Sequence, residues 1–187
     1  MAIDKAFDEI LEVARSGGEW AMETLYRDLA PAVLGYLRAQ GAVDPEDATS
    51  EVFVGMVRNL HGFDGDEEAF RSWVFSIAHR RLLDQYRWRA RRQEDATDPA
   101  AFAGPLGARL TGDVEDDALE RIGSRRAVEA LLVLPPDQRA VLLLRIVADL
   151  PVARVAQVLG KSKAAVKSLQ ARGLRALARK IQPEGVS

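Results

Sequence analysis

Two segments of this chain carry side chains of the kinds that bind nucleic acid. The first, "RSWVFSIAHRRLLDQYRWRARR" from Arg71 to Arg92, contains seven arginines and one aspartate. At about 100° per residue in a helix, one face of it collects hydroxyls, an imidazole and guanidiniums, which suit bases and phosphates. That face consists of Ser72, Ser76, His79, Arg80, Leu83 and Arg87.

The second segment lies within "LPVARVAQVLGKSKAAVKSLQARGLRAL", whose last part would present small and basic side chains on one side of a helix. Small residues allow close approach to a major groove, Ser168 and Arg172 can reach base edges, and the remaining cations can meet phosphates. The side consists of Ala164, Lys167, Ser168, Ala171, Arg172, Arg175 and Arg179.

The order of elements around this second segment is typical of a DNA-binding helix-turn-helix. Pro151 can open a short helix, Gly160 permits a tight turn, and Ser162 can cap the second helix. The inward residues are expected to be Val152, Val155, Ala156 and Leu159, then Val166, Leu169, Gly173, Leu174 and Leu177. A helix pair of this kind is also an ordinary structural element, and that interpretation stays open.

The sequence offers no basis for catalysis. His61 and His79 are the only histidines, and no carboxylate pair, glycine-rich phosphate loop or metal-ligand spacing accompanies them. We therefore expect no enzyme, no metal and no cofactor. With no cysteine, no signal-peptide pattern and no run of roughly 18 apolar residues, the prediction is a soluble cytoplasmic protein.

Charge is unevenly distributed along the chain, although the formal net charge is only −2. Residues 1–70 carry a net −10 and 93–137 a net −6, whereas 71–92 carry +6 and 138–187 carry +8. Two basic blocks between acidic ones suggest two surfaces that face polyanions. Two well-solvated helical faces would give the same pattern, so charge alone does not decide.

Apolar residues recur at helical spacing almost everywhere, which predicts an all-α protein. Helices are expected at about 4–15, 19–40, 45–60, 67–92, 118–133, 136–148, 152–159 and 163–181. Residues 93–117 are rich in Gly, Pro, Asp and Ala and predict a flexible acidic linker. Two small helical domains follow, 1–92 and 118–187.

The helix predicted at 45–60 has a clear start, with Asp44 as N-cap and Pro45 in the first position. Its buried stripe is expected to be Ala48, Val52, Phe53, Met56, Val57 and Leu60. The opposite face carries Asp47, Ser50, Glu51, Val54 and Arg58. An apolar Val54 among charges can mark a protein contact, but single exposed valines are common.

The Arg71–Arg92 helix also has an apolar side. Phe70, Trp73, Val74, Ile77 and Ala78 lie within about 140° of one another on the helix and are expected to be core. The tryptophan at 73 is therefore interpreted as an anchor in the domain and not as a platform for stacking bases.

As a whole the chain resembles bacterial sigma factors of the extracytoplasmic-function type, group IV of the sigma-70 family. The segment "LPPDQRAVLLLRIVADLPVARVAQVLGKSKAAVKSLQARGLRAL" is similar to region 4, and residues 25–87, from "LYRDLAP" to "LLDQYR", are similar to region 2. The resemblance implies a dissociable subunit of RNA polymerase that has no catalytic activity and directs the core enzyme to promoter DNA.

The resemblance also implies roles for residues. Region 4 reads the minus-35 element, here with Lys163 and the helix face defined above. Region 2 reads and opens the minus-10 element with the Ser72–Arg87 face, and a loop captures a flipped base, for which the candidates are Asn59, His61, Phe63 and Asp64. Phe63 could equally cap the core. The Asp47–Arg58 face corresponds to the segment that docks on the polymerase clamp helices.

Two residues depart from the family pattern. Ser50 stands where the family commonly has Gln, which affects any contact that needs the longer amide. Ser72 stands where housekeeping sigma factors carry the first of two aromatics, and its loss should weaken strand separation. The resemblance further implies a monomer that an anti-sigma factor holds inactive.

Two other functions remain compatible with the sequence. A helix-turn-helix regulator would bind palindromic duplex DNA as a dimer and without polymerase. An all-helical adaptor would bind acidic proteins and neither DNA nor polymerase.

Overall fold

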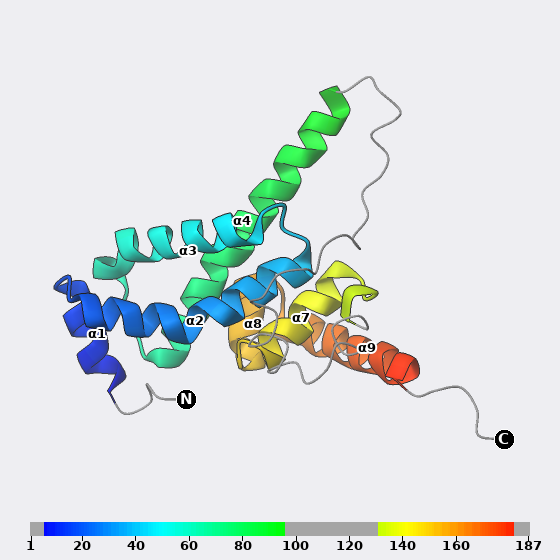
Figure 1. The fold of residues 1–187 in the computed structure, drawn as a ribbon. Helices are drawn as coiled ribbons and strands as arrows, with labels where there is room; N and C mark the ends of the chain where they lie inside the picture. The colour runs from blue at the N-terminus through cyan, green and yellow to red at the C-terminus, as the bar shows by residue number, and fades with distance from the viewer. Residues whose placement is uncertain (1–5, 96–130, 182–187) are drawn as a thin grey trace.

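The computed structural model describes residues 6–95 and 131–181, and every element in those ranges is helical (Figure 1). The elements are α1 (Phe7–Arg15), α2 (Glu19–Gln40), α3 (Pro45–Asn59), the short 3-10 helix η1 (Leu60–Gly62), α4 (Glu67–Asp95), α7 (Pro136–Ile146), α8 (Val152–Leu159) and α9 (Lys163–Ile181). The all-helical prediction is therefore confirmed for the described residues.

The predicted helix ends agree with those of the structure to within a few residues. Helix α4 continues to Asp95, three positions past its predicted end, so it includes the first residues that were expected to be linker. The rest of the predicted linker lies outside the described residues, as does nearly all of the helix predicted at 118–133. None of the described helices has the length and apolarity that crossing a membrane requires.

The predicted helix starts and turns are present. The Asp44 carboxylate accepts a hydrogen bond from the backbone N–H of Asp47 at 2.9 Å, and Pro45 is the first residue of α3. The Ser162 hydroxyl accepts one from the N–H of Ala165 at 3.1 Å at the start of α9. Gly160 has φ of +60°, a left-handed conformation that most residues adopt only at a cost. Local chemistry thus fixes the starts of α3 and α9, two of the helices that carry predicted sites.

Two residues expected to be buried are exposed. Val57 of α3 is 46% exposed and Leu174 of α9 is 47% exposed. Both lie at the edge of their helix's apolar stripe, where the neighbouring helix no longer covers them. The expectation of core positions at Val57 and Leu174 was therefore wrong.

The N-terminal half, α1 to α4, packs around aromatic side chains. Phe70, Val74 and Ala78 of α4 are buried as predicted, while Trp73 and Ile77 are half-buried against the same core. The predicted apolar side of α4 thus anchors the helix in the domain.

The two halves of the chain contact each other: α8 packs against α4, and α7 packs against α2 (Figure 1). Arg139 of α7 is 2% exposed and donates from Nη1 to the carbonyl oxygen of Ala39 at 2.9 Å. The Tyr86 hydroxyl of α4 donates to the next carbonyl, that of Gln40. The last carbonyls of a helix have no donor within it, so these two side chains satisfy the end of α2.

Candidate nucleic-acid interface

The predicted recognition face of α9 is fully open to solvent. Its exposed residues are Lys163, Ala164, Lys167, Ser168, Ala171, Arg172, Arg175 and Arg179. On the opposite side, Val166 and Leu169 are buried, and a Cβ at Gly173 would lie 2.9 Å from Leu142 Cδ1 of α7. Close packing on one side therefore leaves the whole predicted face free on the other.

The arginines of this face are available for a ligand. The Nε atoms of Arg172 and Arg175 lie 3.4 and 3.3 Å from the carbonyl oxygens of Ser168 and Ala171, four residues earlier in the helix. Among the described residues neither guanidinium forms an ion pair with a carboxylate. Both can bind phosphate or the edge of a guanine without breaking an ion pair first.

The predicted face of α4 divides into two parts. Arg80, Leu83 and Arg87 are exposed, and Arg87 pairs with Asp84 at 3.1 Å. Ser72 is only 5% exposed, and the Ser76 hydroxyl donates to the Ser72 carbonyl oxygen at 2.8 Å. All six predicted residues thus lie on one side of α4, but only Arg80, Leu83 and Arg87 are exposed to solvent.

His79 is the titratable residue in the covered part of this face. Its Nδ1 lies 2.8 Å from the hydroxyl of fully buried Tyr36. Burial lowers the pKa of His79, nearby Asp137 opposes that change, and Lys161 adds to it. Burial also raises the pKa of Tyr36, so its hydroxyl stays protonated and can donate a hydrogen bond to Nδ1 of His79. This hydrogen bond holds the imidazole ring of His79 in one orientation.

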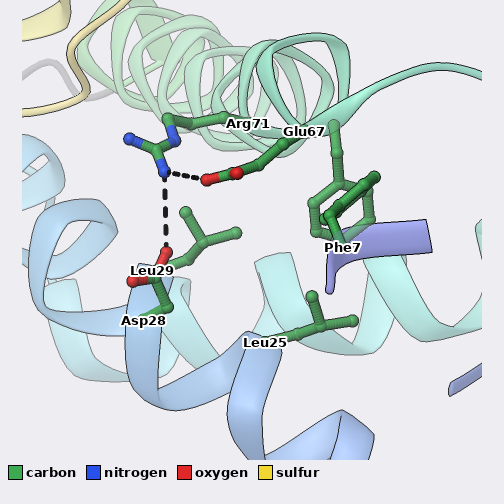
Figure 2. Close-up of a pocket in the computed structure, with 7 residues that line it drawn as sticks. Phe7, Leu25, Asp28, Leu29, Glu67 and Arg71 are labelled. Carbon is green, nitrogen blue, oxygen red and sulfur yellow. Dashed lines mark hydrogen bonds and ion pairs between the residues drawn. The ribbon is translucent and has the colours of Figure 1, made fainter. Parts of the chain in front are cut away.

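Arg71, the first arginine of the basic segment, has a structural role. Its side chain is 9% exposed and lies between the carboxylates of Glu67, at 2.7 Å, and Asp28 of α2, at 3.7 Å (Figure 2). These groups border a small pocket whose apolar side is formed by Phe7, Leu25 and Leu29 (Figure 2). Arg71 therefore ties α4 to α2 and does not belong to the surface that the basic block predicted.

Of the four residues predicted to bind a flipped base, only Phe63 is partly buried. Asn59, His61 and Asp64 are exposed, and the Asn59 amide donates to the Gly55 carbonyl oxygen at 2.8 Å. Phe63 is half-buried and stacks on Trp73, with ring centroids 5.1 Å apart. A third ring, Phe70, meets Phe63 edge-on at 5.2 Å. Phe63 thus caps the core, which was one of its two predicted roles.

The outer face of α3 is open, and its apolar part is larger than predicted. Asp47, Ser50, Glu51, Val54 and Arg58 are all exposed, as expected.

Val57 adds a second exposed valine one turn from Val54, and Tyr26 of α2 packs on Phe53 with ring centroids 4.6 Å apart while remaining 49% exposed. Their exposure could not be read from the sequence, because apolar residues at helical spacing predict burial.

Within the described residues, no three His, Asp or Glu side chains gather closely enough to ligate an ion. Basic and hydroxyl side chains dominate both predicted faces, and these suit an anionic polymer.

Comparison with known protein families gives two matches. The family model "Sigma-70 region 2" matches residues 25–92, and the model "Sigma-70, region 4" matches residues 124–177. Region 2 includes the faces of α3 and α4 described above, and region 4 includes α7, α8 and most of α9.

Curated relatives are similar over most of this chain. An ECF RNA polymerase sigma factor of Streptomyces coelicolor, BldN, is 31% identical over 173 residues, which cover 91% of this chain and 64% of the relative. The ECF RNA polymerase sigma factor SigD of Mycobacterium tuberculosis is 28% identical over 186 residues, covering 95% of this chain and 85% of the relative. The chain thus spans just under two thirds of the first relative and most of the second.

Two solved structures share the fold. CnrH, solved in complex with the cytosolic domain of CnrY, aligns with a TM-score of 0.62 at 24% identity, covering 94% of this chain and 97% of that chain. The sigma factor RpoE of Bartonella quintana, solved with the anti-sigma factor NepR, aligns with a TM-score of 0.68 at 18% identity, covering 87% and 98%.

Proposed function

Because this chain belongs to the extracytoplasmic-function sigma factors of the sigma-70 family, we propose that it binds bacterial core RNA polymerase and directs it to specific promoters. Sigma factors are not enzymes, and the polymerase performs the chemistry. The observation that carries the proposal for this chain is the open basic face of α9, backed by a close-packed helix-turn-helix.

In this proposal the domain at 118–187 reads the minus-35 element as duplex DNA. Helix α9 lies in the major groove, Ser168 and Arg172 contact base edges, and small Ala164 and Ala171 allow close approach. The outer cations Lys163, Lys167, Arg175 and Arg179 contact phosphates and set the register of the helix on the DNA.

The domain at 1–92 reads and opens the minus-10 element, and residues 93–117 connect the two domains. Exposed Arg80, Leu83 and Arg87 of α4 are the first to meet the DNA, followed by Ser72, Ser76 and His79. Asn59, His61 and Asp64 form the pocket for a flipped base, where contacts must recover the few kcal/mol that unstacking costs. Phe63 contributes only the edge that its stacking on Trp73 leaves free.

The outer face of α3 docks on the polymerase. Asp47, Ser50, Glu51, Val54 and Arg58 surround an apolar centre that Val57 and Tyr26 enlarge. An apolar centre with a charged rim is the usual anatomy of a protein interface. Ser50 is too short for a contact that the family's Gln would make, and its hydroxyl already donates to the Glu46 carbonyl oxygen at 3.1 Å.

Regulation in this proposal is by an anti-sigma factor acting on a cytoplasmic, monomeric protein. The support is that the Bartonella RpoE was solved with the anti-sigma factor NepR, and CnrH with the cytosolic domain of CnrY.

Reconstitution tests the proposed function. The purified chain and bacterial core polymerase are mixed with fragments of the genome that encodes the chain, and the transcripts are mapped. We expect transcription from a small set of fragments that share two upstream elements. Arg172→Ala should reduce this selectivity, whereas Arg27→Ala, which removes an exposed arginine of α2 that pairs with Glu23, should not. Absence of selective transcription by the folded chain would contradict the proposal.

A further inference from the structure

Helix α1 lies beside the loop that joins α3 to α4 (Figure 1). The guanidinium of Arg15, at the end of α1, donates from Nη2 to the backbone carbonyl oxygen of Phe63 in that loop. At the start of α1, the ring of Phe7 lies 5.5 Å from the ring of Phe70, measured between centroids, and Phe70 in turn meets Phe63. Both ends of α1 therefore reach Phe63, one through its backbone and the other through the ring of Phe70.

Arg15 makes this contact without a competing carboxylate. Within the parts of the chain that the structure describes, its guanidinium forms no ion pair. Its Nε is buried and has no hydrogen-bond partner there. A charged donor forms a stronger hydrogen bond than a neutral one, and more so away from water. The Phe63 carbonyl is therefore the group that holds the Arg15 side chain in place.

The hydrogen bond from Arg15 also determines the direction of the loop. A trans peptide is planar, so its N–H points away from its carbonyl, and none of the described peptide bonds is cis. Because Arg15 draws the Phe63 carbonyl toward α1, the N–H of Asp64 is directed away from α1. The Phe63 ring is held separately by its stacking on Trp73. Asp64 therefore leaves the core from a residue that is fixed at both its backbone and its ring.

The other side of Asp64 is fixed as well. Gly65 has φ of +148°, which other residues rarely adopt, and a Cβ there would lie 2.8 Å from Ala69 Cβ and 3.2 Å from Phe63 Cζ. The Asp66 carboxylate accepts a hydrogen bond from the N–H of Ala69 at 2.8 Å, which ties the end of the loop to α4. Asp64 thus lies between two fixed points, Phe63 and Asp66.

We propose that Arg15 is a positioning residue for base capture, which orients the Phe63–Asp64 peptide so that the base pocket is formed before DNA binds. This inference rests on the proposed function, which places a flipped base beside Asn59, His61 and Asp64. In this role Arg15 acts through the loop and not by contact with the base. A pocket that is already ordered avoids the cost of ordering on binding and can distinguish bases by their geometry.

The fluorescence of Trp73 reports the position of the loop in the free chain. The chain has three tryptophans, so Trp20→Phe and Trp88→Phe leave Trp73 as the only one. The two residues replaced are about half exposed, at 52% and 50%. Because Phe63 stacks on the Trp73 indole, a displaced loop should make Trp73 easier to quench with acrylamide.

Three substitutions in this background isolate the hydrogen bond. Arg15→Met keeps the apolar stem but removes the donor, and it should increase the quenching of Trp73. Arg15→Lys keeps a donor and should restore most of the protection. The matched control, Arg38→Met, removes another partly buried arginine of the same half, one that pairs with Glu46 and not with the loop, and it should leave the quenching unchanged.

The second measurement is the base preference of the holoenzyme formed with bacterial core polymerase, on duplexes whose minus-10 segment is already unpaired and carries each of the four bases in turn. Asp64→Ala identifies the position that the pocket reads. Arg15→Met should reduce the preference at that position by about tenfold and leave the other positions unchanged. Combined with Asp64→Ala it should add little, because both changes affect the same contact. Arg15→Lys should recover part of the preference.

A merely structural role for Arg15 would lower binding evenly at all positions, and that outcome would overturn the inference, as would unchanged quenching of Trp73 in Arg15→Met. Failure of the proposed function gives a different result. If the unaltered holoenzyme shows no base preference, the proposed function fails, and base capture through Arg15 fails with it. If the preference is present and Arg15→Met keeps it in full, the inference about Arg15 fails and the proposed function stands.

Discussion

The faces of α9 and α4 have similar compositions but opposite accessibility. Both carry arginines and hydroxyls at helical spacing, and both were predicted to bind nucleic acid. On α9 all eight predicted residues are exposed, whereas on α4 Ser72 is buried, and Ser76 and His79 are partly buried. The difference lies in what packs nearby, because α8 lies against α4 and nothing in the described residues covers the outer face of α9.

This difference separates two properties of a binding surface. Side-chain chemistry at the correct spacing determines what a face can bind, and tertiary contacts determine when it can bind. A recognition helix that is always open suits duplex DNA, which needs no rearrangement to be read. In the proposed function, the partly covered face of α4 instead receives unpaired bases.

The largest effect is expected from Phe75→Ala. Phe75 is fully buried and meets Tyr36 edge-on, with centroids 5.7 Å apart, beneath the covered part of α4. Removing the ring should cost about 3–5 kcal/mol of unfolding free energy, measured by urea unfolding followed by circular dichroism. Leu83→Ala, at a position 36% exposed on the same helix, should cost less than about 1 kcal/mol. Equal costs would mean that α4 is not packed through Phe75.

The next largest effect is expected on α9, where two arginine substitutions distinguish a side chain that reads bases from one that contacts phosphate. Arg172→Ala should reduce discrimination between the correct minus-35 sequence and a mismatched one by roughly 1–3 kcal/mol, because a bidentate contact to a base is lost. Arg179→Ala should weaken binding evenly across sequences and reduce the salt dependence. Binding isotherms on matched and mismatched duplexes check both. Equal, sequence-independent losses would remove Arg172 from the residues that read bases.

Most of the fold could be predicted because local chemistry determines it. The caps at Asp44 and Ser162 and the turn at Gly160 act within a few residues, so the helices that carry the sites begin where the sequence indicates. Burial was predicted less well for residues at the edges of a helix's apolar stripe. Whether Val57 or Leu174 is covered depends on how far a neighbouring helix extends, which periodicity does not encode.

Contacts between the halves could not be predicted at all. Arg139 is buried at the end of α2 and Arg154 pairs with Glu68, although the partners are far apart in sequence and belong to segments interpreted as separate domains. A buried arginine has no signature of its own, because its partner here is a backbone carbonyl at a helix end. The same is true of the Tyr36 hydroxyl that fixes His79.

A smaller effect is expected from Ser162→Ala at the start of α9. Loss of the hydrogen bond to the N–H of Ala165 should cost about 1 kcal/mol of unfolding free energy and weaken duplex binding, since the cap fixes the first turn of the recognition helix. Ser168→Ala, at an exposed position on the same helix, should leave stability nearly unchanged. If both variants unfold alike, the cap does not determine the start of α9.

The smallest effect, and the one most specific to the covered face, is a dependence of stability on pH through His79. Its pKa is lowered in the folded chain, mainly by burial, while the unfolded chain keeps a value of about 6.5. Above that pH the ring is neutral in both states and contributes nothing. As the pH falls through about 6.5, His79 binds a proton in the unfolded state at a higher pH than in the folded state. The unfolding free energy therefore falls.

Between about pH 7.5 and about pH 5.5, the unaltered chain should therefore lose more of its urea midpoint than His79→Gln does. Arg27→Glu should leave this difference unchanged and serves as the control. Identical pH profiles for the unaltered chain and His79→Gln would show that burial does not alter the titration of His79, and the contrast between the two faces would then rest on Ser72 and Ser76 alone.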